Sequence, residues 1–136
     1  MRRSLPAALA ALILLALPAA ASAATPGTYK GETDGGQVVN AKVSKPNKLA
    51  RLSFAISTRC GSGPTARFSR DILFVENVRI KADGSSKKSS KGEQTDGLAT
   101  FELKGKFKGS KLTGSVDDFF RNGCRAFELT FIAKRK

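Results

Sequence analysis

Apolar and polar residues alternate with a period of two along much of the chain after residue 24. In the stretch GQVVNAKVSKP, Val39, Ala41 and Val43 share one face, while polar residues occupy the other. The next segment is expected to point four residues inward: Ala50, Leu52, Phe54 and Ile56. A period of two is typical of β-strands with one buried face, whereas a sustained 3.6-residue helical period is missing. The pattern therefore predicts an all-β fold.

Later segments of the chain repeat this alternation. The segment 78–82 is expected to bury Val78, Ile80 and Ala82. Asp83-Gly84 ends that strand with a hairpin signal. The last strand is expected to bury Phe127, Leu129, Phe131 and Ala133. With segments 27–32 and 68–74, the chain holds about seven to eight short strands, which favours a single antiparallel β-barrel or β-sandwich.

The stretch FELKGKFKGSKLTGSV, residues 101–116, predicts a hairpin with a defined register. Gly109-Ser110 fits a two-residue type II′ loop, because glycine readily takes the positive φ of its first position. The pairs that follow are Lys108–Lys111, Phe107–Leu112, Gly105–Gly114 and Leu103–Val116. Apolar residues then meet apolar residues on one face, which supports the register. Opposed Gly105 and Gly114 predict a covering aromatic side chain or a sharp bend of the sheet.

The segment SSKKSSKGEQTDG, from Ser85 to Gly97, contains no apolar residue. This composition is typical of an exposed edge hairpin or of a mobile loop, and both alternatives stay open. In an edge hairpin, its charges would guard the sheet against pairing with another chain.

The first 23 residues have the layout of a secretory signal peptide. Arg2 and Arg3 precede an apolar run from Leu5 to Leu17, and small residues follow it. A membrane-spanning helix needs about 20 apolar residues, so we expect cleavage near Ala23, with a retained N-terminal anchor as the alternative. The expected mature protein is one β domain, 24–136, without a transmembrane segment. It is expected to be secreted, or to lie in the periplasm or cell envelope.

The chain is strongly basic, with 24 Lys and Arg against 11 Asp and Glu and a formal net charge of +13. Loss of Arg2 and Arg3 with the signal peptide leaves +11 on the 113 mature residues. Such a charge favours anionic partners, namely nucleic acid, phosphate-bearing wall polymers, acidic glycans or membrane surfaces. It also serves the solubility of a small exported protein.

Cys60 and Cys124 are the only cysteines, and in an exported protein an even count predicts a disulfide. Closing a loop of 64 residues stabilises a fold by about 4 kcal/mol in the chain-entropy treatment. Cys60 is in phase with the inner face of its strand, whereas Cys124 is out of phase with Phe127 and Leu129. A bulge near Cys124, or a bridge at the rim of the barrel, would reconcile the two phases.

The chain contains no histidine, which excludes Ser-His-Asp and Cys-His nucleophilic sites and histidine-bearing zinc sites. Asp117-Asp118 is the obvious carboxylate pair for glycosidase chemistry. Adjacent residues on a strand point to opposite faces, so this pair is expected to serve a turn before Phe119-Phe120 instead. We therefore predict no catalytic residue, no metal and no cofactor. An enzyme that uses Ser, Lys or carboxylates is kept as a minor alternative.

Two groups of lysines are the candidate anion-binding residues. The first, on the outer face of the 101–116 hairpin, is Lys104, Lys106, Lys108 and Lys111; the second is Lys87, Lys88 and Lys91. Same-face residues on a strand lie about 7 Å apart, close to the phosphate spacing of an extended polyanion. Lysine supplies point charges and hence little selectivity. The alternative is an ordinary solvated sheet face.

Several motifs resemble those of small exported β domains of unknown function in high-GC bacteria, which begin Gly-x-Tyr-x-Gly-x-Thr. The residues that carry the resemblance are GTYKGETDGG, Cys60, Ile80 with Asp83-Gly84, the Gly105-x-Phe107-x-Gly109 hairpin and Cys124. A weaker resemblance is to lipocalin-like barrels, which carry Gly-x-Trp where this chain has Gly27-Thr28-Tyr29. The missing Trp favours a filled core over a ligand cavity.

The sequence therefore predicts an exported non-enzymatic binding protein, whose partner is an anionic cell-envelope polymer or another polyanion. The alternative is a calycin-like carrier of a small apolar ligand, or an inhibitor of a secreted enzyme. An open apolar cavity of about 300 Å³ or more would favour the carrier.

Overall fold

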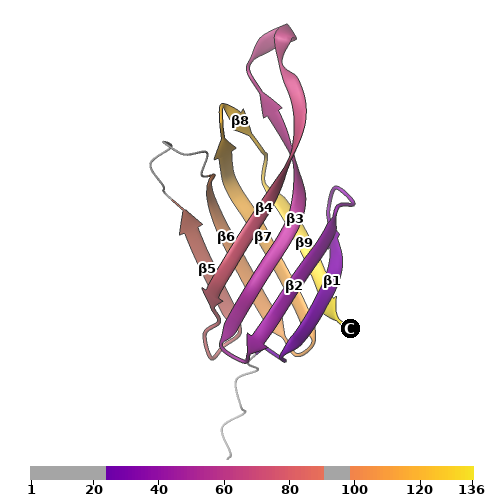
Figure 1. Ribbon diagram of the computed structural model, residues 1–136, viewed down its shortest axis with the longest axis vertical. Coiled ribbons are helices and arrows are strands. Elements are labelled where there is room, and N and C mark those ends of the chain that lie inside the picture. Colours follow the sequence, from indigo (N-terminus) through magenta and orange to yellow (C-terminus); the bar gives the residue numbers. More distant parts are fainter. Residues whose placement is uncertain (1–23, 91–98) are drawn as a thin grey trace, which may run out of the picture.

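The computed structural model describes residues 24–90 and 99–136. These residues form nine strands and a single 3₁₀ turn, η1 (Gly63–Thr65) (Figure 1). The strands are β1 (Gly27–Thr33), β2 (Val38–Lys45), β3 (Lys48–Cys60), β4 (Arg67–Arg79), β5 (Ser85–Ser90), β6 (Thr100–Lys108), β7 (Lys111–Arg121), β8 (Cys124–Arg125) and β9 (Leu129–Arg135). The predicted all-β class is confirmed.

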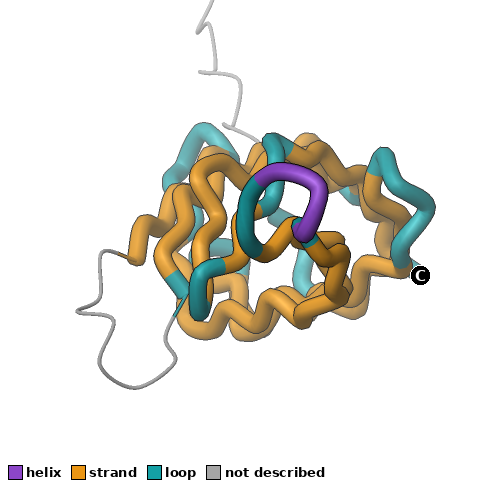
Figure 2. The backbone as a smooth tube through the Cα atoms, turned by 90° about the horizontal axis from the view of Figure 1, so that it is seen from above, coloured by secondary structure: helices purple, strands orange, loops and turns teal. Residues whose placement is uncertain are grey.

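The strands form an antiparallel barrel rather than a sandwich. Their order is β4-β3-β2-β1-β9-β7-β6-β5, and the short β8 pairs with both β3 and β7. The strands β3, β2, β1, β9, β7 and β8 therefore close into a ring, and Figure 2 shows the wall around the interior. An isolated bridge between Ile80 and Ser86 also joins the two outermost strands, β4 and β5, beside the turn that connects them.

The predicted register of the β6–β7 hairpin is confirmed at all four expected pairs. Gly109 has φ +59°, the positive value that the first loop position needs. The prediction of a covering aromatic is confirmed for Gly114 but not for Gly105, because Phe131 of β9 lies opposite Gly114 and over it. A Cβ at Gly114 would lie 2.4 Å from the Phe131 ring. Gly105 is covered by the hydroxyl of Ser86 on β5.

The interior of the barrel is filled by side chains that meet across it. The ring centroids of Tyr29 on β1 and Phe107 on β6 are 5.6 Å apart. Those of Phe54 on β3 and Phe131 on β9 are 5.3 Å apart. Neither pair of strands is adjacent in the sheet, so these rings fill the space between opposite walls.

Four residues expected in the core are not fully buried there; one of them, Leu129, is half-buried and packs against the core. Phe127 is 81% exposed because β9 begins at Leu129, so the inward phase of that strand does not extend to it. Ala82 is exposed because it lies in the turn after β4. Ala50 is only half-buried because register shifts between β2 and β3 place Leu49 in the core instead.

Asp117-Asp118 lies within β7 and not in a turn, so that prediction is wrong. Asp118 has φ +53°, and the pairing of β6 with β7 shifts register at this point. This is the geometry of a β-bulge, which Asp tolerates because its short polar side chain suits the left-handed region. The bulge reverses the phase of the strand and so turns Phe119 into the core.

The polar segment from Ser85 to Gly97 begins as a strand at the edge of the barrel. Its first six residues form β5, which pairs with β6. The rest of the segment, Lys91 included, lies outside the described residues, as does the predicted signal peptide.

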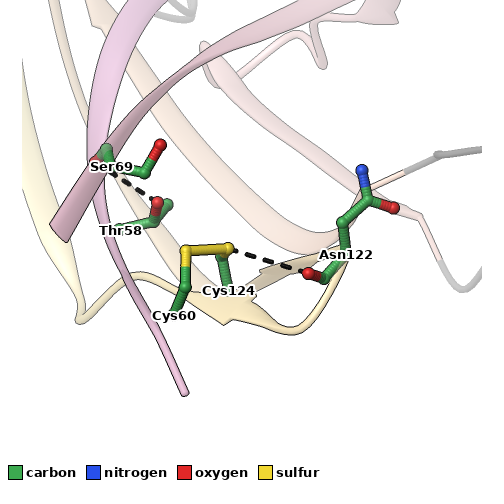
Figure 3. The surroundings of a disulfide bond; sticks show 5 residues. All are labelled: Thr58, Cys60, Ser69, Asn122 and Cys124. Atoms are coloured by element: carbon green, nitrogen blue, oxygen red, sulfur yellow. Dashed lines mark hydrogen bonds between the residues drawn. A yellow bond between two sulfur atoms is a disulfide. The ribbon is translucent and has the colours of Figure 1, made fainter. Parts of the chain in front are cut away.

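The strands β3 and β4 are the longest, at 13 residues each, and their far ends project beyond the barrel as an arm (Figure 1). Cys60 ends β3 directly opposite Cys124 of β8, and the two form the predicted disulfide (Figure 3). Because β8 is separate from β9, the phase of the last strand does not extend back to Cys124. The bond therefore ties the end of β3, within the arm, to β8.

Candidate anion-binding surface

The structure places the described members of the two predicted lysine groups on neighbouring strands. Lys104, Lys106, Lys108 and Lys111 are exposed on the outer face of β6 and β7, as predicted. Lys87 and Lys88 lie on β5, with Lys87 directly opposite Lys104. Lys87 thus extends the outer face of β6 and β7 onto β5, whereas Lys88 pairs with the buried Leu103 and points to the opposite face of its strand.

Acidic side chains neutralise much of that face. The Glu102 carboxylate lies 3.2 Å from Lys87 Nζ and 3.3 Å from Lys104 Nζ. Lys104 also lies 3.9 Å from Asp117, and Lys106 lies 3.9 Å from Asp83. The hydrogen bonds that Lys87 and Lys104 donate hold the pKa of Glu102 below its ordinary value of 4.5. Lys87, Lys104 and Lys106 are therefore weaker candidates for binding an external anion.

Lys88 has a structural contact. Its Nζ donates a hydrogen bond of 2.8 Å to the backbone carbonyl oxygen of Glu76 on β4. This bond spans the two strands β4 and β5, which share only the Ile80–Ser86 bridge as a backbone pairing.

The other predicted lysines belong to a longer row that the sequence does not reveal. Lys108 lies opposite Lys111, Lys111 opposite Lys134, and Lys134 opposite Lys30. We call these four residues the lysine row; they lie on β6, β7, β9 and β1, and all are exposed. Neighbouring strands are about 5 Å apart, so the row places four positive charges on a short path. Within the described parts of the chain, none of the four forms a salt bridge.

A second set of opposed basic residues lies on the other side of the barrel. Arg79 of β4 faces Lys48 of β3, which faces Lys45 of β2. The sequence does hold a signal for Lys45 and Lys48, because KPNK resembles KGSK at 108–111, with two loop residues between lysines. No such signal exists for Lys30 and Lys134, since their alignment depends on the strand order.

Carboxylates gather in a shallow groove near β8, which shares residues with the lysine face of β6 and β7. Its lining includes Glu102, Asp117, Asp118 and Glu128, beside Lys104 and Arg125. A glycosidase needs an acid whose pKa is raised, whereas the pKa of Glu102 is lowered by its two lysines. Glu102 is thus held as a carboxylate and does not suit proton donation. Across residues 24–90 and 99–136, no group of three or more Cys, Asp or Glu side chains is arranged to hold a metal ion.

Comparisons with protein-family models, with curated proteins and with solved structures find no match to this chain. The resemblance to small exported β domains therefore stays a prediction. A search of the described residues finds no helix with the length and apolar character to cross a membrane.

Proposed function

We propose that this protein is an exported, non-enzymatic binding protein that engages anionic polymers or surfaces through its outward lysines. The observation that carries the proposal is the lysine row, Lys108–Lys111–Lys134–Lys30. Like charges directly opposite each other on a sheet destabilise it. An anionic partner would remove that repulsion, so the relief of repulsion between the lysines would add to the free energy of binding.

The chemistry of the row predicts strong but weakly selective binding. Lysine ammonium groups are compact point charges without the planar geometry that reads a particular anion. A partner that neutralises several of them releases counterions, so affinity should fall steeply as salt rises. The proposed partner is therefore defined by its charge density, as an anionic cell-envelope polymer would be.

The alternative of a small-ligand carrier receives less support. A carrier needs an internal apolar cavity, whereas aromatic rings meet across this barrel at Tyr29–Phe107 and Phe54–Phe131. An inhibitor of a secreted enzyme would bind through its outer surface. The filled interior therefore argues neither for nor against that alternative.

The test is a titration of the purified exported form against wall polymers, lipopolysaccharide and DNA at rising salt. We expect binding at low salt that weakens as salt increases. The double variant K111Q/K134Q should weaken binding by about tenfold or more, since each neutralised contact contributes separately. The matched control, K87Q/K106Q, removes the same charge from lysines that already have carboxylate partners. Absence of binding at low salt would contradict the proposal.

A further inference from the structure

Six exposed basic residues gather at one end of the barrel. The β2–β3, β4–β5 and β6–β7 turns and the C-terminus all lie at the end opposite the arm (Figure 1). The basic end, as we call it, consists of Lys45, Lys48, Arg79, Lys108, Lys111 and Lys134, all exposed. Five of its members are at a strand terminus beside a turn.

Few negative charges offset the basic end. Asp83 is the acidic residue of the three described turns, and it lies near Lys106 while accepting hydrogen bonds from Ser85. Within the described residues, no member of the basic end takes part in a salt bridge. The end therefore carries a concentrated positive potential.

The side chains at this end do not suit nucleic acid. Single-strand binders stack bases on exposed aromatic rings, whereas the strongly exposed Phe68 and Phe127 lie toward the arm end of the molecule. Five of the six charges are lysines, which lack the planar fork that recognises bases and phosphates by geometry. Three separate turn tips also present their charges as a broad surface rather than along a groove, which fits a flat anionic layer.

The start of the described chain is fixed at the same end. Ala24 is buried, and the Thr25 hydroxyl donates a hydrogen bond to the carbonyl oxygen of Gly109 in the β6–β7 turn. Arg135 Nε donates another, of 2.8 Å, to the carbonyl oxygen of Pro26. The predicted signal segment, with its apolar run from Leu5 to Leu17, joins the fold here. While that segment is in the membrane, the basic end is the part of the barrel closest to the bilayer.

We propose that the basic end docks the barrel end-on to the anionic phosphate headgroups of a lipid bilayer. This inference rests on the proposed function and specifies its partner and its contact surface. A polybasic surface close to an anionic bilayer gains attraction with every lysine or arginine that reaches the headgroups. The arm and the disulfide then point away from the membrane.

The experiment measures partition of the exported form onto vesicles of phosphatidylglycerol mixed with phosphatidylcholine, and onto phosphatidylcholine alone. We expect binding to the anionic vesicles only. The variant K45Q/K48Q/K108Q/K111Q should weaken that partition by about tenfold or more, since it removes four contacts of the basic end.

The matched control removes four positive charges from the other end, as R59Q/R67Q/R70Q/R125Q, and should change partition by less than about threefold. Thermal melts of both variants establish that they fold. Equal losses in the two variants would show that only net charge matters, which overturns the inference. Tighter binding to soluble polyphosphate or DNA than to vesicles, at equal phosphate concentration, overturns the lipid assignment and leaves the proposed function intact. Binding to none of these probes overturns both.

Discussion

Tyr29 is the only tyrosine, and the chain has no tryptophan. Its ring is buried, and its hydroxyl donates a 2.7 Å hydrogen bond to the Thr25 carbonyl oxygen. Burial raises the pKa of Tyr29 above its ordinary value of 10.0. We therefore expect phenolate absorbance in the folded protein to titrate with a midpoint above pH 10, and to titrate at lower pH in denaturant.

The same shift has a consequence for stability. The neutral phenol is favoured in the folded state, so its contribution is complete below the ordinary pKa and is lost as pH rises through the raised value. Tyr29→Phe should remove this alkaline dependence and lower the free energy of unfolding by about 1 kcal/mol at neutral pH, since one hydrogen bond is lost. A folded-state midpoint at or below pH 10 would contradict the prediction.

Gly114 tests the packing of the barrel wall. A Cβ there would lie 2.4 Å from the Phe131 ring and 2.6 Å from the Lys104 carbonyl oxygen. Gly114→Ala should therefore cost about 1–3 kcal/mol, as overpacking does, measured by denaturant unfolding. The control is Gly35→Ala, where the nearest atom is 3.8 Å away. Equal stability of the two variants would show that the Phe131 ring does not press on Gly114.

The Gly-x-Tyr-x-Gly-x-Thr start consists of residues that the fold requires. Tyr29 fills the core, and a Cβ at Gly31 would lie 1.8 Å from the Ile132 carbonyl oxygen on β9. The Thr33 hydroxyl accepts a hydrogen bond from the Gln37 backbone amide in the β1–β2 turn. A motif of this kind predicts a fold and leaves the function open, because the side chains at its fixed positions, Tyr29 and Thr33, are buried.

At the scale of the elements, the β6–β7 hairpin was predictable because turn chemistry and alternation agree. Gly109-Ser110 sets the loop, and the loop sets every pair that follows it. The bulge at Asp118 was not predictable, since Asp-Asp before two aromatics also suits a turn. Phe127 was misplaced because alternation does not show where a strand begins.

The lysine row was predictable from the sequence only in part. Its first pair, Lys108 and Lys111, follows from the hairpin loop. Lys134 and Lys30 join it only because β9 inserts between β7 and β1. The β1–β9 pairing joins Lys30 to Lys134, 134 − 30 = 104 positions apart in the sequence, and no local pattern specifies it.

The row predicts an unequal response to charge reversal. Lys111 lies between two lysines, Lys108 on β6 and Lys134 on β9. Lys108 has one opposed lysine, Lys111. Lys111→Glu should stabilise the barrel by about 0.2–1 kcal/mol for each of two pairs, and Lys108→Glu for one pair. Unfolding in urea at low salt measures the difference. Destabilisation by either variant would show that the opposed lysines do not repel.

At the scale of the whole molecule, the described charges are unevenly distributed. Carboxylates accompany some basic residues of the middle and the arm end, as in Arg121–Asp71 and Arg51–Glu76. Among the described residues, the members of the basic end form no salt bridge, and neither do the arm-end residues Arg59, Arg67, Arg70 and Arg125. The free protein should therefore carry a repulsion that salt screens and that acid increases.

Acid and salt should change the stability of the barrel through different charges. The pKa of Glu102 is lowered by Lys87 and Lys104, and that of Asp83 is lowered by hydrogen bonds from Ser85 and by Lys106. A lowered pKa contributes stability above the ordinary value, and the contribution is lost as pH falls through the folded-state value. The melting temperature should thus decrease as the pH drops below about 4, where the ordinary pKa values of Asp and Glu lie.

Salt should oppose that fall only in part. Screening relieves the repulsion within the basic end, so added salt should raise the melting temperature, whereas the K45Q/K48Q/K108Q/K111Q variant should gain much less. Glu102→Gln should be less stable than the wild type at neutral pH and should depend less on pH in the acid range, because its side chain no longer titrates. Thermal melts across pH at two salt concentrations measure both effects. An equal gain from salt in the wild type and in the fourfold variant would place the repulsion elsewhere in the molecule.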